Sequence, residues 1–415
     1  MSNTQKKNVP ELRFPGFEGE WEEKKLGEFC EFNNGINAKK EQYGMGRKFI
    51  NVLDILNNNF ITYENIIGKV SVPENVEKNN KVEFGDLVFL RSSETREDVG
   101  LCNVYLDKNY ALYGGFIIRG KKVSDYNPIF LKEALNIPKK RYEIGSAAGG
   151  STRFNVSQDI LRKINVKFPP IEEQQKIGKF LSKLDRQIEL EEQKLELLQQ
   201  QKKGYMQKIF SQELRFKDEN GEDHPDWEEK KLGDITEQSM YGIGASATRF
   251  DSKNIYIRIT DIDEKSRKLN YQNLTTPDEL NNKYKLKRND ILFARTGAST
   301  GKSYIHKEEK DIYNYYFAGF LIKFEINEQN SPLFIYQFTL TSKFNNWVKV
   351  MSVRSGQPGI NSEEYAKLPL VLPDKLEQQK IAEFLDRFDR QIELEKQKIE
   401  ILQQQKKGLL QSMFI

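Results

Sequence analysis

The chain has 415 residues, which is enough for two or three domains with separate cores. No stretch reaches the roughly 18–20 consecutive apolar residues of a membrane-spanning helix, so we expect a cytoplasmic protein with no membrane partner. The 65 basic and 61 acidic side chains leave a net charge of +4, which permits nucleic-acid or protein partners without favouring either. Two widely separated cysteines and two histidines argue against a disulfide framework and a zinc site.

The chain repeats itself after about half its length. Glu11–Phe14 recurs as Glu213–Phe216, and Trp21–Gly27 recurs as Trp227–Gly233. Gln174–Gly204 aligns without gaps on Gln378–Gly408, with 23 of 31 positions identical. Because the segments between these anchors diverge, the chain is a tandem duplication in which a variable segment precedes a near-invariant one.

The variable segments are predicted to be domains with much β-structure. In the first, residues 1–168, Val82–Leu90 and Tyr113–Arg119 have the β-branched and aromatic composition of strands, and Phe130–Leu135 is typical of a short helix. The second domain, residues 212–372, repeats this character. Its predicted strands are Ile255–Ile259, Asp290–Arg295 and Tyr315–Phe324, and its predicted helix is Leu333–Thr341.

Each domain is followed by a predicted long helix, at residues 169–211 and 373–415. Prolines precede both helices, and apolar residues recur at 4-3 spacing for more than four heptads, which indicates a coiled coil. The seam residues are Ile177, Leu181, Leu184, Ile188, Leu195 and Leu198 in the first helix and Ile381, Leu385, Phe388, Ile392, Ile399 and Leu402 in the second. Glu191, Lys202 and their second-copy counterparts interrupt it. The alternative is a pair of ordinary amphipathic helices in a core.

Chain connectivity favours an antiparallel pair. A helix of about 39 residues is roughly 58 Å long, whereas a domain of the size between the helices has a radius of gyration near ~15 Å. In a parallel pair that domain would have to reach back along the whole first helix. We therefore expect an α+β protein, with two mixed α/β domains separated by a long antiparallel two-helix coiled coil in a pseudo-two-fold tandem repeat.

Motifs for catalysis are incomplete. Gly297–Ser303 resembles a phosphate-binding loop but has three residues between its glycines, where the motif requires four. Gly242–Ala247 fits a dinucleotide-binding pattern, yet Thr236–Met240 before it is too polar for the buried strand required. Asn127–Phe130 lacks the second proline of an adenine methyltransferase tetrad, and Asp226 with Glu228 is too tightly spaced for a nuclease cluster. The sequence therefore favours a binding protein with no catalytic residue and no metal.

Leu12–Trp21, Phe168–Ile177 and Asp290–Lys302 resemble the specificity subunit of type I restriction-modification enzymes over nearly the whole chain. The resemblance implies two target-recognition domains, each reading one half of a bipartite site in double-stranded DNA, and a helical spacer that sets the half-site distance. It also implies two modification (methyltransferase) subunits and two restriction (translocase-nuclease) subunits as partners. S-adenosylmethionine, ATP and Mg²⁺ would belong to those partners, with no cofactor in this chain. A coiled-coil scaffold with two protein-binding heads and a stand-alone DNA-modifying enzyme are the alternatives.

The two copies act as an internal control on candidate DNA-binding residues. Residues identical in both copies cannot distinguish two different half-sites, so Arg91 and Arg295 are interpreted as phosphate or loop-holding groups, with a plain salt bridge as the alternative. Divergent polar loops are the candidates for base reading, although each such residue is also compatible with a solvated loop. In the first domain they are Ser92, Ser93, Thr95, Arg96, Ser151, Thr152 and Arg153, and in the second Tyr241, Arg249, Thr296, Ser299, Lys302, Arg354 and Gln357.

Overall fold

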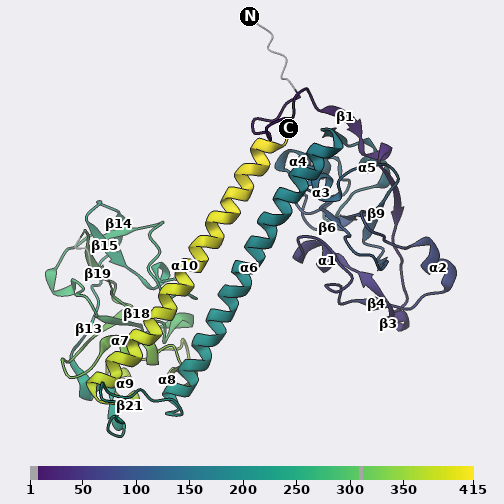
Figure 1. The fold of residues 1–415 in the computed structure, drawn as a ribbon. Helices are drawn as coiled ribbons and strands as arrows, with labels where there is room; N and C mark the ends of the chain where they lie inside the picture. The colour runs from purple at the N-terminus through teal and green to yellow at the C-terminus, as the bar shows by residue number, and fades with distance from the viewer. Residues whose placement is uncertain (1–7, 308–311) are drawn as a thin grey trace, which may run out of the picture. The chain divides into compact units, whose positions relative to one another are not determined.

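The structure is a computed structural model that describes residues 8–307 and 312–415. It forms two compact units, one made of the chain up to Gln193 together with Glu395–Ile415, the other of Lys194–Leu394. Each unit therefore contains one variable domain and a part of both long helices (Figure 1). Within the described ranges, no helix combines the length and the hydropathy of a membrane span.

The variable domain of the first unit is built on a four-stranded antiparallel sheet. Its strand order is β2-β9-β5-β7, formed by Cys30–Asn34, Ile117–Lys122, Leu87–Leu90 and Cys102–Val104. A smaller sheet places β3 (Tyr43–Ile50) between β4 (Lys69–Val70) and β8 (Leu112–Tyr113), and β3 runs parallel to β8. The two-stranded pairs are β1 (Glu22–Lys25) with β11 (Asn165–Phe168) and β6 (Ser92–Ser93) with β10 (Phe154–Asn155). The short helices are α1 (Val52–Asn57), α2 (Glu74–Asn79), α3 (Pro128–Asn136), α4 (Pro138–Ala147) and α5 (Gln158–Lys163).

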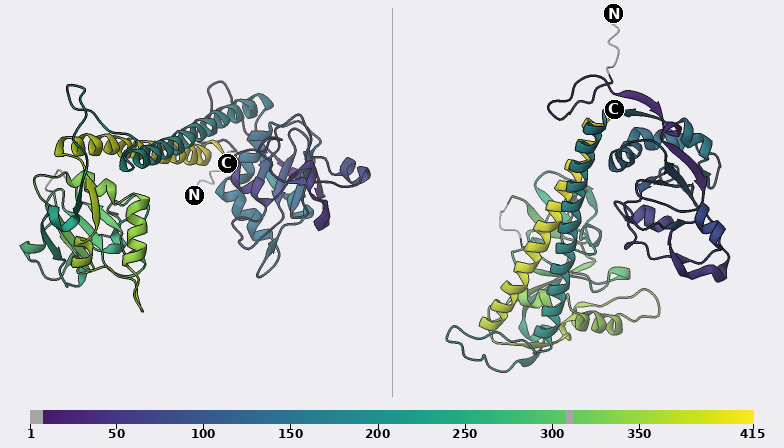
Figure 2. Two further views of the ribbon diagram at one scale, coloured as in Figure 1. Left: turned by 90° about the horizontal axis from the view of Figure 1, so that it is seen from below. Right: turned by 45° about the vertical axis from the view of Figure 1, so that its right-hand side comes forward.

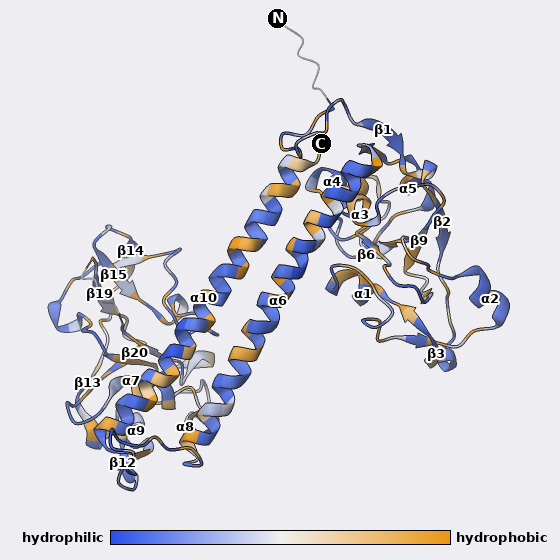
Figure 3. Cartoon of the chain, in the orientation of Figure 1, coloured by the Kyte–Doolittle hydropathy of each residue, from blue (hydrophilic) through white to orange (hydrophobic). Residues whose placement is uncertain are grey.

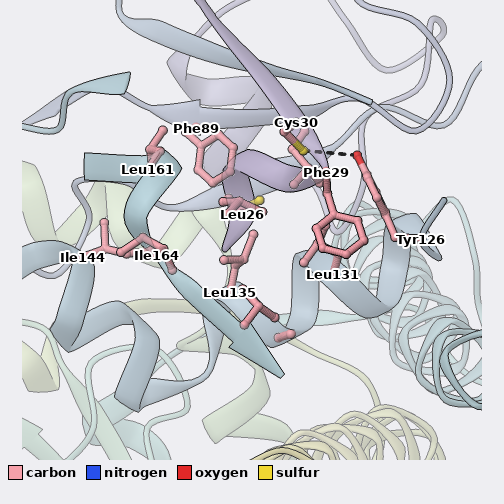
Figure 4. Packing of buried hydrophobic residues seen from close by; sticks show 14 of the residues in the cluster. Leu26, Phe29, Cys30, Phe89, Tyr126, Leu131, Leu135, Ile144, Leu161 and Ile164 are labelled. Atoms are coloured by element: carbon pink, nitrogen blue, oxygen red, sulfur yellow. Dashed lines mark hydrogen bonds between the residues drawn. The ribbon is translucent and has the colours of Figure 1, made fainter. Parts of the chain in front are cut away.

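Helices α3, α4 and α5 contribute to one hydrophobic core with this sheet (Figure 4). Helix α3 starts with Pro128 at its first position, and the Asn127 side chain accepts a hydrogen bond from the Phe130 amide at 2.9 Å. Its buried side chains, among them Leu131 and Leu135, pack in the same cluster as Phe89 of β5.

The second unit repeats this topology with a different sequence. Its main sheet has the order β13-β20-β17-β18, formed by Thr236–Tyr241, Leu321–Ile326, Ile291–Ala294 and Ser303–Ile305. A parallel pair joins β15 (Asn254–Ile257) to β19 (Asn314–Phe317). The remaining pairs are β14 (Ala247–Arg249) with β16 (Thr275–Pro277) and β12 (Glu228–Lys231) with β21 (Pro369–Leu372). The helices are α7 (Pro332–Phe338), α8 (Ser342–Met351) and α9 (Ser362–Ala366).

All five predicted strands are shorter than expected or interrupted. Asp290–Arg295 forms a strand only over Ile291–Ala294, and Ile255–Ile259 ends at Ile257, before a 3₁₀ turn at Ile259–Asp261. The strand predicted at Val82–Leu90 begins only at Leu87, because Gly85 adopts φ +89° in the turn before it. Tyr113–Arg119 and Tyr315–Phe324 are each divided into two strands. Each interruption is a tight turn. In the first domain the Ile117 amide donates to Gly114 O at 2.9 Å, and in the second the Leu321 amide donates to Ala318 O at 2.8 Å. A strand pattern alone did not reveal these turns.

The two long helices are α6 (Ile171–Phe210) and α10 (Lys375–Met413), which run side by side in Figures 1 and 2. In the first unit, Lys406 pairs with Asp185 at 2.6 Å and Lys398 with Glu191 at 2.5 Å. Since the residue number of the partner on α10 decreases as the residue number on α6 increases, the helices are antiparallel. The predicted antiparallel coiled coil is thereby confirmed.

The coiled-coil seam is made of the predicted apolar residues, which alternate with polar positions along both helices (Figure 3). Every predicted seam side chain is buried or half-buried, with Ile177, Leu181, Ile381 and Leu385 nearly inaccessible. In the second unit, the Tyr205 ring lies against Phe388, with ring centroids 5.6 Å apart. The seam thus follows the 3.5-residue period expected of paired helices.

The repeated anchors connect each domain to its helices. Arg13 donates two hydrogen bonds to the buried Glu173 carboxylate at 2.8 and 2.7 Å, and Arg215 contacts Glu377 in the same way at 3.3 and 2.7 Å. The Gln174 side chain donates to Pro169 O at 2.9 Å and accepts from the Asn127 amide of α3 at 3.1 Å. These residues are near-invariant between copies because they fix the start of each helix against its own domain.

Candidate nucleic-acid interface

Arg91 and Arg295 directly follow the equivalent strands β5 and β17. The Arg91 amide donates to Phe116 O at 2.8 Å, and its guanidinium donates to Gly115 O at 3.2 Å. The Arg295 amide donates to Phe320 O at 3.1 Å, while its guanidinium lies 5.0 Å from the Tyr241 ring centroid. Arg91 therefore bonds the turn at Gly115 and Phe116 to the end of β5, and its contact with a DNA phosphate stays a prediction.

Several predicted residues of the first domain lie around the turn that carries Phe116. Ser92 and Ser93 pair through the backbone with the strand that follows the exposed loop Ser151–Arg153. The Arg153 guanidinium lies 5.5 Å from the centroid of the Phe116 ring. This loop and turn form one exposed polar and aromatic surface.

Two predicted residues of the first domain make internal contacts. Arg96 donates to Gly145 O at 2.9 Å and Ala148 O at 3.2 Å, and its guanidinium lies 4.3 Å from the Phe154 ring centroid. Thr95 Oγ1 donates to Asp98 at 2.7 Å. Arg96 thus fixes the end of α4 beside the loop, and its possible contact with DNA stays a prediction.

In the second domain, four of the predicted residues meet around the equivalent turn. The Tyr241 hydroxyl accepts from the Ser362 amide at 3.1 Å, and Thr296 pairs through the backbone with Gly359. Gln357 lies so close to Gly297 that a Cβ there would approach its Nε2 to 2.9 Å. Arg295 thus lies between the Tyr241 and Phe320 rings, while Thr296 lies in the adjoining loop that starts at Arg295 and Gln357 lies against that loop at Gly297.

The remaining predicted residues of the second domain differ in accessibility. Arg249 is exposed on β14, and Ser299 is half-buried in a 3₁₀ turn at Gly297–Ser299. Arg354 makes a bidentate pair with Glu364 at 2.5 and 2.6 Å. Lys302 is only 6% exposed, and its ammonium contacts Glu264 at 2.6 Å and donates to Ile262 O at 3.1 Å. The Lys302 ammonium is therefore already bonded inside the domain.

Phe116 and Phe320 were not singled out from the sequence, although they occupy equivalent positions on this surface. Their side chains are 57% and 59% exposed. Phe116 and Phe320 align with each other when the two copies of the repeat are superposed in sequence. This correspondence could have identified them from the sequence. Both lie inside the predicted strands Tyr113–Arg119 and Tyr315–Phe324, and a strand pattern does not separate an exposed ring in a turn from a buried one.

Metal-ligating side chains and cysteine thiols are the remaining groups to place in the described residues. No cluster of three or more metal-binding side chains occurs among residues 8–307 and 312–415. Burial raises the pKa of the Cys30 thiol to about 12, and burial likewise raises that of Cys102 well above its usual value. Neither thiol has the lowered pKa of a cysteine nucleophile.

Sequence comparison adds the deciding observation. The family described as "Type I restriction modification DNA specificity domain" matches residues 18–200 and again residues 225–404. The chain belongs to this family. The two matches coincide with the two copies of the repeat, so each copy is one family domain with its helix.

Individual relatives resemble the chain over most of its length. The type I restriction enzyme MjaVIII specificity subunit of Methanocaldococcus jannaschii is 24% identical, over 97% of this chain and 93% of the relative. The type I restriction enzyme StySPI specificity subunit of Salmonella potsdam is 23% identical, over 75% of this chain and 69% of the relative. The crystal structure of the S subunit of a type I restriction-modification system from M. genitalium matches with a TM-score of 0.65 and 16% identity, over 98% and 99% of the two chains. The latter similarity establishes a shared fold.

Proposed function

We propose that this chain is the DNA-reading specificity subunit of a type I restriction-modification complex acting in the cytoplasm. Each variable domain would bind one half of a bipartite duplex site, and the paired helices would set the distance between the half-sites. The observation that carries the proposal is one topology used twice, with equivalent loops that differ in sequence. Two divergent readers on near-identical helices suit a target made of two different half-sites.

Catalysis is assigned to partner subunits. Two modification (methyltransferase) subunits would bind S-adenosylmethionine, and two restriction (translocase-nuclease) subunits would use ATP and Mg²⁺. The family match to a DNA specificity domain over both copies of the repeat supports this division of roles.

A pair of equivalent grooves supports docking of two identical partners. In the first unit a groove of about 390 Å³ lies between the spacer helices and the loop joining α3 to α4, and in the second a groove of about 920 Å³ lies between the spacer helices and the start of α8 with the loop before it. Several of their helix-side residues are identical in the two copies. These are Gln199 and Gln403, Lys203 and Lys407, Gln207 and Gln411, and Ile392 and Ile188. Grooves of different size that share these helix residues, beside divergent domains, fit a partner that does not depend on the DNA sequence.

The test is reconstitution with methyltransferase subunits. The chain alone, the methyltransferase subunits alone and their mixture are each given duplex DNA and labelled S-adenosylmethionine, and the modified sites are mapped by methylome sequencing. We expect methylation of one bipartite sequence only in the mixture. Methyl transfer by the contaminant-free chain alone would overturn the assignment to a non-catalytic subunit, and a mixture that ignores DNA sequence would favour a plain scaffold.

A further inference from the structure

An exposed phenylalanine stands at the same turn in both domains. The segments are Tyr113-Gly-Gly-Phe116-Ile-Ile and Phe317-Ala-Gly-Phe320-Leu-Ile, in which the phenylalanine, the glycine before it and the last isoleucine are identical and the other three positions differ conservatively. A single exposed apolar side chain is ordinary on a protein surface. Retention of the same exposed ring in two domains that have otherwise diverged indicates a shared role at the surface.

The backbone presents this ring rigidly. In the first domain the Gly115 amide donates to Ile36 O at 2.9 Å, and in the second the Gly319 amide donates to Ile243 O at 2.8 Å. The carbonyl of each phenylalanine accepts the amide of Arg91 or Arg295, as described above. Because the turn is bonded on both sides, the ring loses little backbone entropy when a ligand covers it.

Cationic and aromatic side chains surround both rings. Arg153 lies 5.5 Å from the Phe116 ring centroid, and Arg295 lies 5.9 Å from that of Phe320. Tyr241 adds a second half-exposed ring beside Arg295. A flat apolar ring next to guanidinium groups is suited to a ligand with aromatic faces and negative charge, which describes a nucleic acid.

We propose that Phe116 and Phe320 each insert against a base step of their own half-site and partly unstack it. This inference rests on the proposed DNA-binding function and assigns a role within it. A phenyl ring has no donor or acceptor, and it is identical in both domains, so it cannot specify two different half-sites. Its role is to hold the domain on the duplex and to distort the DNA, while the divergent polar loops read bases.

The experiment uses the full chain with its methyltransferase subunits and a duplex containing the mapped target. Single 2-aminopurine probes are placed along each half-site, away from the adenines to be methylated, since methyltransferases unstack their own target base. The variants are Phe116→Ala, Phe320→Ala and Phe116→Trp. The matched control is Phe84→Ala, because Phe84 is 60% exposed in the first domain and its counterpart one repeat later is Arg288.

We expect wild type to increase probe fluorescence at one step in each half-site. Phe116→Ala should abolish the signal in one half-site only, Phe320→Ala in the other, each weakening binding roughly tenfold or more without changing the methylated sequence. Phe116→Trp should restore both signal and affinity, and Phe84→Ala should match wild type.

Three results would overturn the inference. Alanine variants that bind and unstack DNA like wild type would show that the rings do not touch it. Loss of methyltransferase assembly, measured by native mass spectrometry, with unchanged probe signal would assign the rings to a protein partner. A wild-type complex that binds no duplex sequence specifically would refute the proposed function itself, and the inference with it. Thermal unfolding of every variant identifies a folding defect, in which case the conservative Phe116→Trp and an equivalent Phe320→Trp decide the question.

Discussion

The ammonium of Lys406 lies 2.6 Å from the carboxylate of Asp185, joining the two long helices within the first unit. One repeat away, Lys202 makes the equivalent contact with Asp389 at 2.7 Å in the second unit. The third member of each group differs. Glu133 of α3 lies 3.5 Å from Lys406, whereas the neutral Gln337 of α7 donates to Asp389 at 2.8 Å. The lysine interruptions of the seam, Lys202 and Lys406, thus lie in polar groups that also join each domain to its helices.

This difference predicts that two equivalent substitutions lower the free energy of unfolding by different amounts. Lys406→Ala leaves the buried Asp185 carboxylate without its cation and the buried Glu133 with Lys132 alone, so we expect a loss of about 3 kcal/mol in unfolding free energy. Lys202→Ala leaves Asp389 with its Gln337 hydrogen bond, and about 1.5 kcal/mol is expected. Urea denaturation measures both, with the exposed Lys407→Ala as control. Equal losses would contradict the proposed contribution of Glu133.

The same group predicts a pH dependence. Burial opposes charge on Glu133, yet Lys132 and Lys406 lower its pKa below the usual value. A carboxyl whose pKa is lower in the folded than in the unfolded state stabilises above its unfolded pKa, and this contribution is lost as the pH falls. Glu133→Gln should therefore lose less stability than wild type between about pH 5 and pH 3. Urea unfolding midpoints of wild type and Glu133→Gln, measured across this pH range, test the prediction. If the two midpoints fall in parallel as the pH is lowered, the prediction is wrong.

A comparable asymmetry occurs where the helices begin. Arg13 is the only described side chain bonded to the fully buried Glu173, whereas Glu377 also accepts from the Trp227 indole at 3.1 Å and from the Phe216 amide at 3.2 Å. We expect Arg13→Ala to lower the free energy of unfolding by about 3 kcal/mol and Arg215→Ala to lower it by about 1.5 kcal/mol. Thermal and urea unfolding compare them, with Arg13→Lys separating charge from bidentate geometry. A larger loss for Arg215→Ala would be the contrary result.

Domain exchange tests the one-domain, one-half-site relationship. Replacing residues 29–164 by the equivalent segment of a relative keeps both strands of the β1–β11 pair, whose residues are Glu22–Lys25 and Asn165–Phe168. Since the spacer helices and the second domain are untouched, we expect one half of the methylated sequence to change. Methylome sequencing showing both halves altered would argue against separate readers.

The length of the helices offers a further test. One heptad inserted after Gln193 and another after Gln397 preserves the seam register and adds roughly 10 Å to each helix, equivalent to about 3 bp. The half-site sequences should persist while the unspecified spacer between them lengthens by up to about 3 bp. Rotation of one half-site by roughly 100° would lower activity. An active variant with an unchanged spacer would show that the helices do not set this distance.

The sequence by itself determined the duplication, the two long helices and their seam, because these depend on periodicity and on residues close together in the chain. It also determined the antiparallel direction, since the size of the intervening domain makes the parallel alternative too long. The resemblance to the family followed from the motifs Leu12–Trp21, Phe168–Ile177 and Asp290–Lys302, the second of which includes Glu173 and Gln174 at the start of α6.

Only the tertiary structure decided the chemistry of individual polar residues. Lys302 lies in a loop sequence typical of the surface, yet Glu264 and Ile262 bind its ammonium inside the domain. Phe116 lies in an apolar run typical of a core strand, yet its ring is exposed. It stands in a turn held by two hydrogen bonds, one from the Arg91 amide to Phe116 O and one from the Gly115 amide to Ile36 O. In both cases the hydrogen-bonding or ion-pairing partners of the residue's charged group or backbone lie far away in the sequence. Local pattern cannot supply this information, because burial of a side chain depends on which distant groups the fold brings to it.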